Sequence, residues 1–187
     1  MDGRPATGRR RGVTLVELLV VLSIVAVLAG LATPALRELR HRLQLRLEIE
    51  RLLGSLQLAR GEALLRGSRV ALCPAGPDAG RLDCSGGYRD GWLVFEDRDR
   101  DQRYDPGGDR LLRVAQPLPP RYRYAPRSGE GSLGGAISFL PDGSARRSLT
   151  LRLCPPPELR LQSRSIVLSR VGRLRSALDG PCPVPVP

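Results

Sequence analysis

An apolar run of nineteen residues near the N-terminus, Val13 to Leu31, constrains this chain more than any other feature. Glu17 is the only charged residue in the run. As an α-helix rising about 1.5 Å per residue, it nearly spans a bilayer core of about 30 Å. A basic cluster, Arg9–Arg11, lies just before it. Because positive flanks stay on the cytoplasmic side, the sequence predicts a transmembrane helix with everything after Leu31 outside the inner membrane.

The residue that precedes the run distinguishes it from an ordinary secretory signal. A signal peptide has a shorter apolar region, and its small-residue cleavage site follows that region. Here the small residue, Gly12, comes first, so cleavage at Gly12 would leave the helix on the mature protein. Glu17 is also unusual, because a charge inside a bilayer is costly and usually has a function. The alternative is a plain single-pass anchor with an acid near its end.

Residues Gly12 to Val20 resemble the leader junction of type IV pilins and type II secretion pseudopilins. Those proteins share a Gly, an apolar residue, Thr-Leu, an aliphatic residue, Glu and Leu-Leu-Val, and this chain departs only in having Val13 where Phe is commonest. The resemblance implies cleavage between Gly12 and Val13 by prepilin peptidase and N-methylation of Val13. It also implies that Glu17 pairs with the terminal amine of a neighbouring subunit during assembly. The protein would lie in the inner membrane with a periplasmic C-terminal domain, and then join a pilus fibre on the cell surface.

The helix is expected to continue beyond the membrane. Leucines at three- and four-residue steps, separated by Arg and Glu, predict an amphipathic helix to about Leu65 that ends near Gly67. Pro34 lies in its interior and should weaken or kink it. The predicted segments are a leader (1–12), a transmembrane helix (13–33), the amphipathic half of the helix (34–67) and a β-rich periplasmic or extracellular pilin domain (68–187). The leucines of the stripe are Leu36, Leu39, Leu43, Leu47, Leu53 and Leu56.

The remainder of the chain alternates short apolar runs with clusters of Gly, Pro and Asp, which is typical of strands. The sequence Pro141–Asp142–Gly143 predicts a hairpin turn between two of these runs. A long helix followed by such strands predicts an α+β, pilin-like fold, in which the helix packs on an antiparallel β-sheet. The predicted strands are 69–72, 91–95, 111–115, 121–124, 136–140, 149–153 and 165–169.

Four cysteines occur in the predicted exported domain, and an even number there indicates disulfides. Three pairings are possible, and proximity in the sequence favours Cys73–Cys84 and Cys154–Cys182. A zinc site is not expected, because the sequence has no Cys-x-x-Cys and its one histidine, His41, lies next to the membrane on the predicted helix.

Further motifs resemble the FimT/GspH family of minor pilins. They are an Ala-Arg-x-Glu-Ala helix end, a Leu-Cys-Pro strand, a Gly-Trp strand, and an Ile-Ser-Phe strand followed by a Gly turn. Trp92 is expected to be a core or sheet anchor. The residues concerned are Ala59, Arg60, Glu62, Ala63, Val70, Leu72, Cys73, Pro74, Cys84, Gly91, Trp92, Phe95, Asp97, Ile137, Ser138, Phe139, Gly143, Leu153 and Cys154.

The C-terminal segment Gly172–Arg173–Leu174–Arg175 resembles the Gly-Arg-x-Arg motif of FimT proteins that bind DNA in natural transformation. Gly permits a tight bend, two Arg at i and i+2 can point to one side, and guanidinium groups suit phosphate oxygens. The Cys154–Cys182 bridge would hold this tail against the domain. Other arginines that could enlarge the patch are Arg146, Arg147, Arg164 and Arg170.

The charge of the C-terminal part agrees with a polyanion partner. Residues 110–187 hold thirteen Arg against four acids, a net charge of +9, whereas residues 67–109 have a net charge of −3. A basic half attracts polyanions such as nucleic acid or anionic lipid. The alternative is a solvated basic tail and face, because all thirty basic residues of the chain are Arg and the whole protein is Arg-rich.

Two remaining patterns carry little functional weight. The first is a set of aspartates at the odd spacing of a calcium loop: Asp97, Asp99, Asp101 and Asp105. Gln102 stands where such loops need Gly, and no Glu occupies the bidentate position, so a solvated acidic hairpin loop is the favoured interpretation. The second is a lone Gly-x-Gly-x-x-Gly motif over 129–134, which precedes a strand-like run and gives almost no support for a nucleotide site.

These features predict a FimT-type minor type IV pilin of a Gram-negative bacterium, a non-enzyme with no metal and no cofactor. Its expected partners are other pilins or pseudopilins, prepilin peptidase, the inner membrane and double-stranded DNA. One alternative is a GspH-type pseudopilin of a type II secretion system with no nucleic-acid role. Another is a minor pilin that only primes pilus assembly. The Gly-Arg-x-Arg segment favours the DNA-binding interpretation.

Overall fold

The computed structural model describes residues 13–77, 82–126, 135–159 and 161–182. The chain divides into two compact units, Met1–Arg40 and His41–Pro187. One helix, α1 (Leu15–Arg66), contributes to both. It continues through position 34, so Pro34 does not end it, and the weakening expected there stays a prediction. Among the described residues, no helix is both long and apolar enough to cross a membrane.

The second half of α1 packs on its unit through a stripe that differs from the one predicted. Its large buried residues are Leu45, Ile49, Leu52 and Leu56, and the stripe continues through two buried alanines. The predicted positions Leu36, Leu39, Leu43 and Leu47 are instead more than half exposed, so that part of the prediction is wrong. A pattern of leucines alone overlooks Ile49 and the two small residues near the helix end. These alanines, Ala59 and Ala63, are completely buried in the main core.

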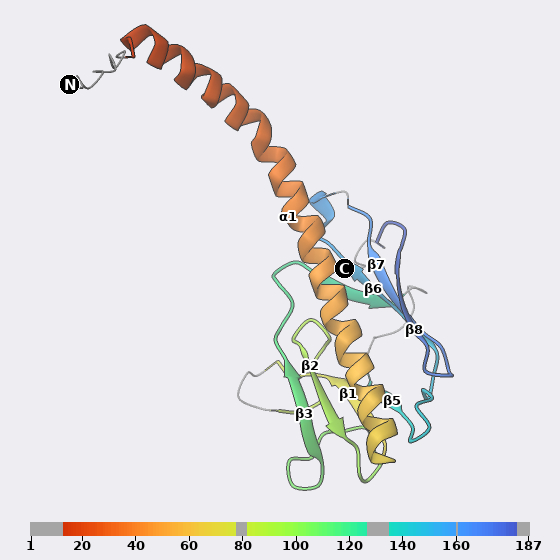
Figure 1. Ribbon diagram of the computed structural model, residues 1–187. Helices are drawn as coiled ribbons and strands as arrows, with labels where there is room; N and C mark the ends of the chain where they lie inside the picture. The colour runs from red at the N-terminus through yellow and green to blue at the C-terminus, as the bar shows by residue number, and fades with distance from the viewer. Residues whose placement is uncertain (1–12, 78–81, 127–134, 160, 183–187) are drawn as a thin grey trace, which may run out of the picture. The chain divides into compact units, whose positions relative to one another are not determined.

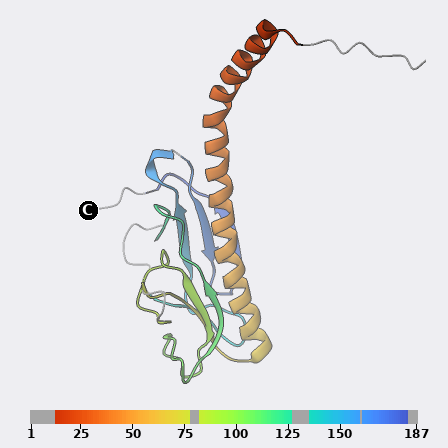
Figure 2. The same ribbon diagram turned by 90° about the vertical axis from the view of Figure 1, so that its left-hand side faces the viewer.

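In the described residues, eight strands form two four-stranded antiparallel sheets (Figure 1). The first sheet has the order β3-β2-β1-β5, and the second has the order β4-β6-β7-β8. Figure 2 shows both sheets on the same side of the second half of α1. The elements are β1 (Val70–Pro74), β2 (Trp92–Glu96), β3 (Arg110–Ala115), β4 (Arg123–Pro126), β5 (Ile137–Phe139), β6 (Leu149–Cys154), η1 (Pro157–Leu159), β7 (Arg164–Leu168) and β8 (Leu174–Leu178).

The predicted α+β fold, a long helix packed on antiparallel strands, is confirmed, with three differences in detail. The strands form two sheets rather than one, β4 begins two residues later than predicted, and β8 was not predicted. The turn at Pro141–Gly143 is present, because the Gly143 N–H donates to the Leu140 carbonyl at 2.8 Å. It does not join neighbouring strands, however, because β5 belongs to the first sheet and β6 to the second. Its arms meet only at the bridge between Phe139 and Ala145.

The main core lies between α1 and the two sheets. Trp92 is completely buried there, which confirms its predicted place. Its ring centroid is 6.4 Å from that of Tyr124, and the Arg51 guanidinium carbon lies 4.8 Å from the ring. A smaller cluster on the other face of the first sheet includes Phe95, whose ring lies 5.5 Å from that of Tyr104. The first sheet is therefore covered on both faces, by α1 on one and by loops on the other.

Candidate functional site

The predicted processing site lies partly within the described residues. Gly12 is outside them, Val13 is exposed just before α1, and Glu17 is in the first turn of the helix. Thr14 caps this helix, since its Oγ1 accepts the Glu17 N–H at 3.2 Å and its carbonyl accepts the Leu18 N–H at 3.1 Å. The sequence reasoning missed this role, although Thr-x-x-Glu is the pattern of a capping box. An acid at this position also interacts favourably with the positive end of the helix dipole.

The Gly-Arg-x-Arg segment forms the turn between β7 and β8 and the start of β8 (Figure 1). The prediction that this segment is a C-terminal tail is therefore wrong. The Ser169 N–H donates to the Arg173 carbonyl at 3.0 Å, and the Gly172 N–H donates to the Ser169 carbonyl at 2.9 Å. The Ser169 hydroxyl oxygen accepts the Arg173 N–H at 3.1 Å. Both ends of the turn are therefore fixed by hydrogen bonds.

Gly172 is required by the contact that this turn makes with the rest of the unit. It has a φ of +75°, and a Cβ at this position would lie 2.0 Å from the Gly143 carbonyl oxygen. The same oxygen accepts a hydrogen bond from Arg60 Nε at 3.0 Å, and the Ala145 N–H donates to the Arg170 carbonyl at 2.8 Å. The turn between β7 and β8 is thus held against both the turn at Pro141–Gly143 that follows β5, hereafter the β5 turn, and the end of α1.

The two arginines of the motif lie on the outer side of this hairpin. Leu174 packs against the main core, and because side chains alternate along a strand, Arg173 and Arg175 lie on the opposite face. Both are exposed, as is Arg170 in the turn. Arg175 belongs to β8, the edge strand of the second sheet, and lies opposite Val167. Within the described part of the chain, none of these three arginines makes an ion pair.

The structure brings some of the other predicted arginines to this turn and separates one from it. Arg146 and Arg147 are exposed and directly follow Ala145, which is hydrogen-bonded to the turn. Arg164 lies opposite Leu178, about 10 Å along the strands from the Val167–Arg175 pair. Its side chain is half-buried and extends from the core-facing side of β7. Arg164 is therefore not part of the same surface.

Both predicted disulfides are confirmed, with Cα–Cα distances of 5.5 Å for Cys73–Cys84 and 5.8 Å for Cys154–Cys182. The second joins the end of β6 to the residues after β8, so it holds the segment 179–182 and not the motif arginines. Arg152, which the sequence reasoning missed, holds the same segment. Its Nε lies 3.1 Å from Asp179 Oδ2, and its Nη1 donates to the Pro181 carbonyl at 3.1 Å.

The β2–β3 loop, Asp97–Asp109, places its acids close together. Carboxylate oxygens of Asp97, Asp99 and Asp109 lie within 4.8 Å of one another, and a second group with the same spacing comprises Asp99, Asp101 and Asp105. Burial raises the pKa of the Asp97 carboxyl above its usual range, and the hydrogen bond from the Gln102 N–H opposes this shift. Asp109 was not among the residues that the sequence pattern had singled out.

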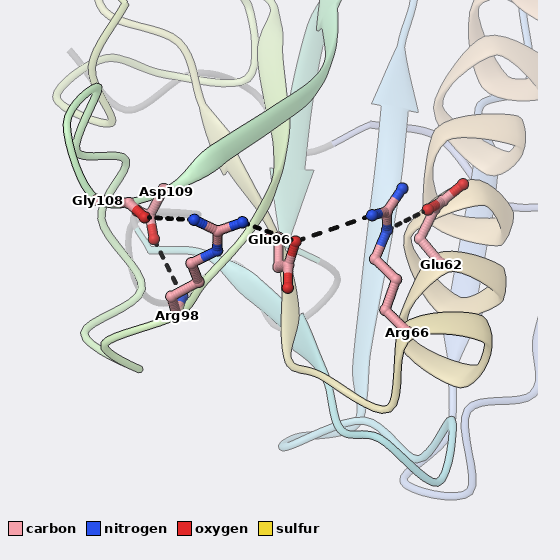
Figure 3. Close-up of polar contacts among 6 residues, drawn as sticks. All are labelled: Glu62, Arg66, Glu96, Arg98, Gly108 and Asp109. Carbon is pink, nitrogen blue, oxygen red and sulfur yellow. Dashed lines mark hydrogen bonds and ion pairs between the residues drawn. The ribbon is translucent and has the colours of Figure 1, made fainter.

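Arginines join this loop to the end of α1, as Figure 3 shows. The Arg98 N–H donates to Asp109 Oδ1 at 3.0 Å, and Arg98 Nη1 donates to the Gly108 carbonyl at 3.4 Å. Arg98 Nη2 and Arg66 Nη1 lie 3.8 Å and 3.9 Å from the same oxygen, Glu96 Oε2. Arg66 also forms an ion pair with Glu62, one turn earlier on the helix. The loop and the helix end are therefore linked through Glu96.

Comparison with family models gives two matches along the chain. A model described as type II transport protein GspH matches residues 48–172. A model described as the prokaryotic N-terminal methylation motif matches residues 7–33. The first covers α1 from Glu48 onward and the strands β1 to β7, and the second covers the end of the predicted leader and the apolar run.

The chain is also similar to a curated protein and to solved structures. It is 34% identical over 168 residues to the pilin-like protein PilA1 of Thermus thermophilus, covering 89% of this chain and 97% of the relative. Its fold is similar to that of the type IV minor pilin FimU of Pseudomonas aeruginosa, with 18% identity, a TM-score of 0.50, and coverage of 72% of this chain and 88% of that one. It is equally similar to the minor pseudopilin EpsH from the type 2 secretion system of Vibrio cholerae, with 14% identity, a TM-score of 0.50, and coverage of 72% and 97%.

Proposed function

The chain belongs to the GspH family, as a minor type IV pilin of the GspH/FimT type, and we propose that its β7–β8 hairpin binds double-stranded DNA for uptake in natural transformation. Membership implies assembly with other pilins or pseudopilins and processing by prepilin peptidase. DNA binding would be an additional property of the exposed face of the second sheet.

The observation that carries this proposal is the exposure of three arginines whose side chains form no ion pair in the described part of the chain. Arg170, Arg173 and Arg175 are exposed at one end of the hairpin, and within the described residues no acid forms an ion pair with them. A guanidinium group donates in a planar fork that matches phosphate oxygens. Because hydrogen bonds and the Gly172–Gly143 contact fix the turn, little conformational entropy would be lost on binding.

The placement of the protein before assembly follows from its N-terminal sequence. We propose that Val13–Leu31 anchors the processed chain in the inner membrane, with unit His41–Pro187 in the periplasm until it enters a fibre. The apolar run and the basic cluster before it support this orientation. Glu17 would pair with the terminal amine of a neighbouring subunit, as the leader resemblance implies.

A DNA mobility shift over a range of salt concentrations tests the binding. With two to four phosphate contacts, the slope of log affinity against log salt should be roughly −2 to −4, at about −0.9 per contact. Arg173→Gln and Arg175→Gln should each flatten the slope by about one unit, equally for unrelated duplex sequences, because phosphate contacts carry no base information. The detergent-solubilised full-length chain should be used.

Arg164→Gln is the matched control, because Arg164 lies at the other end of the hairpin and begins on its core-facing side. It should leave the slope unchanged. In cells, the Arg173→Gln/Arg175→Gln double variant should lower transformation while piliation persists. A double variant that binds DNA as tightly as the wild type would place the DNA surface elsewhere.

A pseudopilin role in type II secretion is the second candidate, and the description of the matching family model favours it. That role requires no nucleic-acid surface. If the wild-type chain shows no salt-sensitive DNA binding at low ionic strength, and its deletion blocks secretion, the pseudopilin role replaces the DNA-uptake role. If binding is absent and only pilus number falls, the chain is an assembly-priming minor pilin.

A further inference from the structure

The β2–β3 loop contains more acid than its own arginines can neutralise. Between Asp97 and Asp109 there are five Asp and three Arg. All five Asp take part in the two close carboxylate groups described above, and Asp99 belongs to both. Like charges this close repel one another unless protons or cations compensate them. A cluster of this kind is common on protein surfaces, so its meaning depends on what else the site contains.

Asp97 provides an independent observation, because one of its oxygens is buried without a donor. Its side chain is 0% exposed, and Asp97 Oδ2 accepts no hydrogen bond from any described residue. The Arg69 guanidinium is the cation recorded beside it, at 4.0 Å from Nη1 to Oδ2, which is beyond hydrogen-bond distance. Burying a carboxylate oxygen without a close partner is costly. Asp97 Oδ2 is therefore a buried carboxylate oxygen with no hydrogen-bond donor among the described residues, on a side chain that belongs to the group with Asp99 and Asp109.

The backbone of the loop also removes the two objections that the sequence raised against a calcium site. Calcium loops of twelve residues need a sharp turn at position six, normally made by Gly. Gln102 occupies that position and adopts a φ of +69°, while its N–H donates to Asp97 Oδ1 at 3.3 Å. The bidentate Glu at position twelve is missing, but Asp109, one residue later, brings its carboxylate to Asp97 and Asp99.

We propose that this loop binds one calcium ion through the carboxylates of Asp97, Asp99 and Asp109. Asp101 and Asp105 lie around Asp99 and add negative charge to the site. Ca²⁺ takes six to eight oxygen ligands in flexible geometry, so water and backbone carbonyls of the loop would complete the shell. Mg²⁺ demands near-ideal octahedral geometry and loses its water reluctantly. Two buried carboxylates, Asp97 and Asp109, and the exposed carboxylate of Asp99 on a loop form a site that suits the larger ion.

The ion would order a loop that is already connected to the helix. Asp109 accepts the Arg98 N–H, Arg98 lies beside Glu96, and Glu96 lies beside Arg66 of α1 (Figure 3). Fixing Asp109 therefore fixes the β2–β3 connection of the first sheet next to the end of α1. The expected result of calcium binding is a more stable unit His41–Pro187.

Calorimetric titration of the detergent-solubilised full-length chain, freed of metal with EDTA, tests the site. The expected result is one Ca²⁺ per chain with a Kd of about 10⁻⁵ to 10⁻³ M, and a melting temperature that rises with Ca²⁺ concentration. Asp99→Asn should weaken binding about tenfold or more. Asp99 is exposed, so this variant should fold. Mg²⁺ should bind at least about tenfold more weakly than Ca²⁺.

Asp142→Asn is the matched control, because Asp142 is an exposed aspartate in the separate β5 turn, and it should bind Ca²⁺ as the wild type does. Absence of heat and of a melting shift at about 10 mM Ca²⁺ would overturn the proposal, and so would unchanged binding by Asp99→Asn or equal affinity for Mg²⁺. Arg69→Gln distinguishes a calcium site from a simple ion pair between Arg69 and Asp97. With a calcium site, Ca²⁺ restores the melting temperature of this variant; an equal loss in EDTA and in Ca²⁺ contradicts the site.

Discussion

Gly172 shows how one residue of the proposed DNA-binding motif is required by packing within the protein itself. Its backbone lies so close to the Gly143 carbonyl that no side chain fits, and its φ of +75° disfavours any other residue. Arg60 donates to the same carbonyl from α1. From the local sequence, Gly172 could be expected only because a tight bend favours Gly. The carbonyl that leaves no room for a Cβ belongs to a different turn, so the residues around Gly172 could not predict this contact.

Gly172→Ala should therefore destabilise the unit by about 1–3 kcal/mol, from a strained left-handed backbone and a clash with the Gly143 carbonyl. Because the clash displaces the turn that carries Arg170 and Arg173, DNA affinity should fall even though no charge is lost. Chemical denaturation followed by the fluorescence of Trp92, the one tryptophan of the chain, measures the stability.

Gly180→Ala is the control for this substitution, because a Cβ there meets nothing within 4 Å and its φ is not positive. It should change the free energy of unfolding by less than about 0.5 kcal/mol. A Gly172→Ala variant that is as stable as this control would mean that the turn is not held against the β5 turn.

At the scale of elements, the helix and strands that could be predicted are those whose structure is determined by their own residues. Local patterns predicted the end of α1 just before Gly67, seven of the strands and the burial of Trp92. The strand β8, Leu-Arg-Ser-Ala-Leu, has no β-branched or aromatic residue and forms because it pairs with β7. Such a strand is a product of tertiary context, which overrides weak local propensity.

The division into two sheets was unpredictable for a similar reason. Nothing in the residues around the Pro141–Gly143 turn shows that β5 pairs with β1 while β6 pairs with β4. For the candidate site, composition indicated the basic surface and the motif, but register decides which arginines share it. Arg175 and Arg164 are on the same hairpin, yet their side chains extend from opposite faces of the sheet.

The position of β8 also changes what the second disulfide is expected to do. Replacing Cys154 and Cys182 by Ala should cost about 2–5 kcal/mol of stability, because the bridge closes a loop across β7 and β8. DNA affinity of the folded protein should stay within about twofold of wild type, since Arg173 and Arg175 are held by the hairpin. Urea denaturation and mobility shifts below the unfolding transition measure the two effects separately.

Loss of the first disulfide, through Cys73→Ala and Cys84→Ala, serves as the comparison. It should destabilise the chain less, because it closes a loop of separation 11 rather than 28. A marked loss of DNA affinity on removing only Cys154–Cys182 would show that the segment 179–182 takes part in binding or positions the arginines.

At the scale of the whole molecule, the N-terminal residues and the folded unit differ in what their sequences provide. The unit His41–Pro187 carries its own core, two sheets and both disulfides. The segment before it carries the methylation motif, and its apolar residues are exposed in the single chain, with Leu15 at 74% and Val16 at 68%. Exposed apolar surface of this extent is covered by a membrane or by partner helices. Processing and assembly should therefore depend on residues that add nothing to the folding of the unit.

Substitutions at Gly12 and Glu17 test this separation. Gly12→Val should leave an uncleaved precursor, because a side chain obstructs the peptidase at the scissile bond, and mass spectrometry of the wild type should show a methylated Val13 terminus. Two roles proposed for Glu17, subunit pairing and helix capping, have to be separated, since it is the third residue of a helix capped by Thr14. Glu17→Gln preserves the capping pattern and removes the charge, whereas Glu17→Ala removes both. If the charge pairs with a neighbouring subunit, both variants are cleaved normally and both are missing from sheared surface filaments. A Glu17→Gln variant that enters filaments as well as wild type would assign Glu17 to helix capping alone, and a wild-type chain that retains Met1 would contradict the processing step itself.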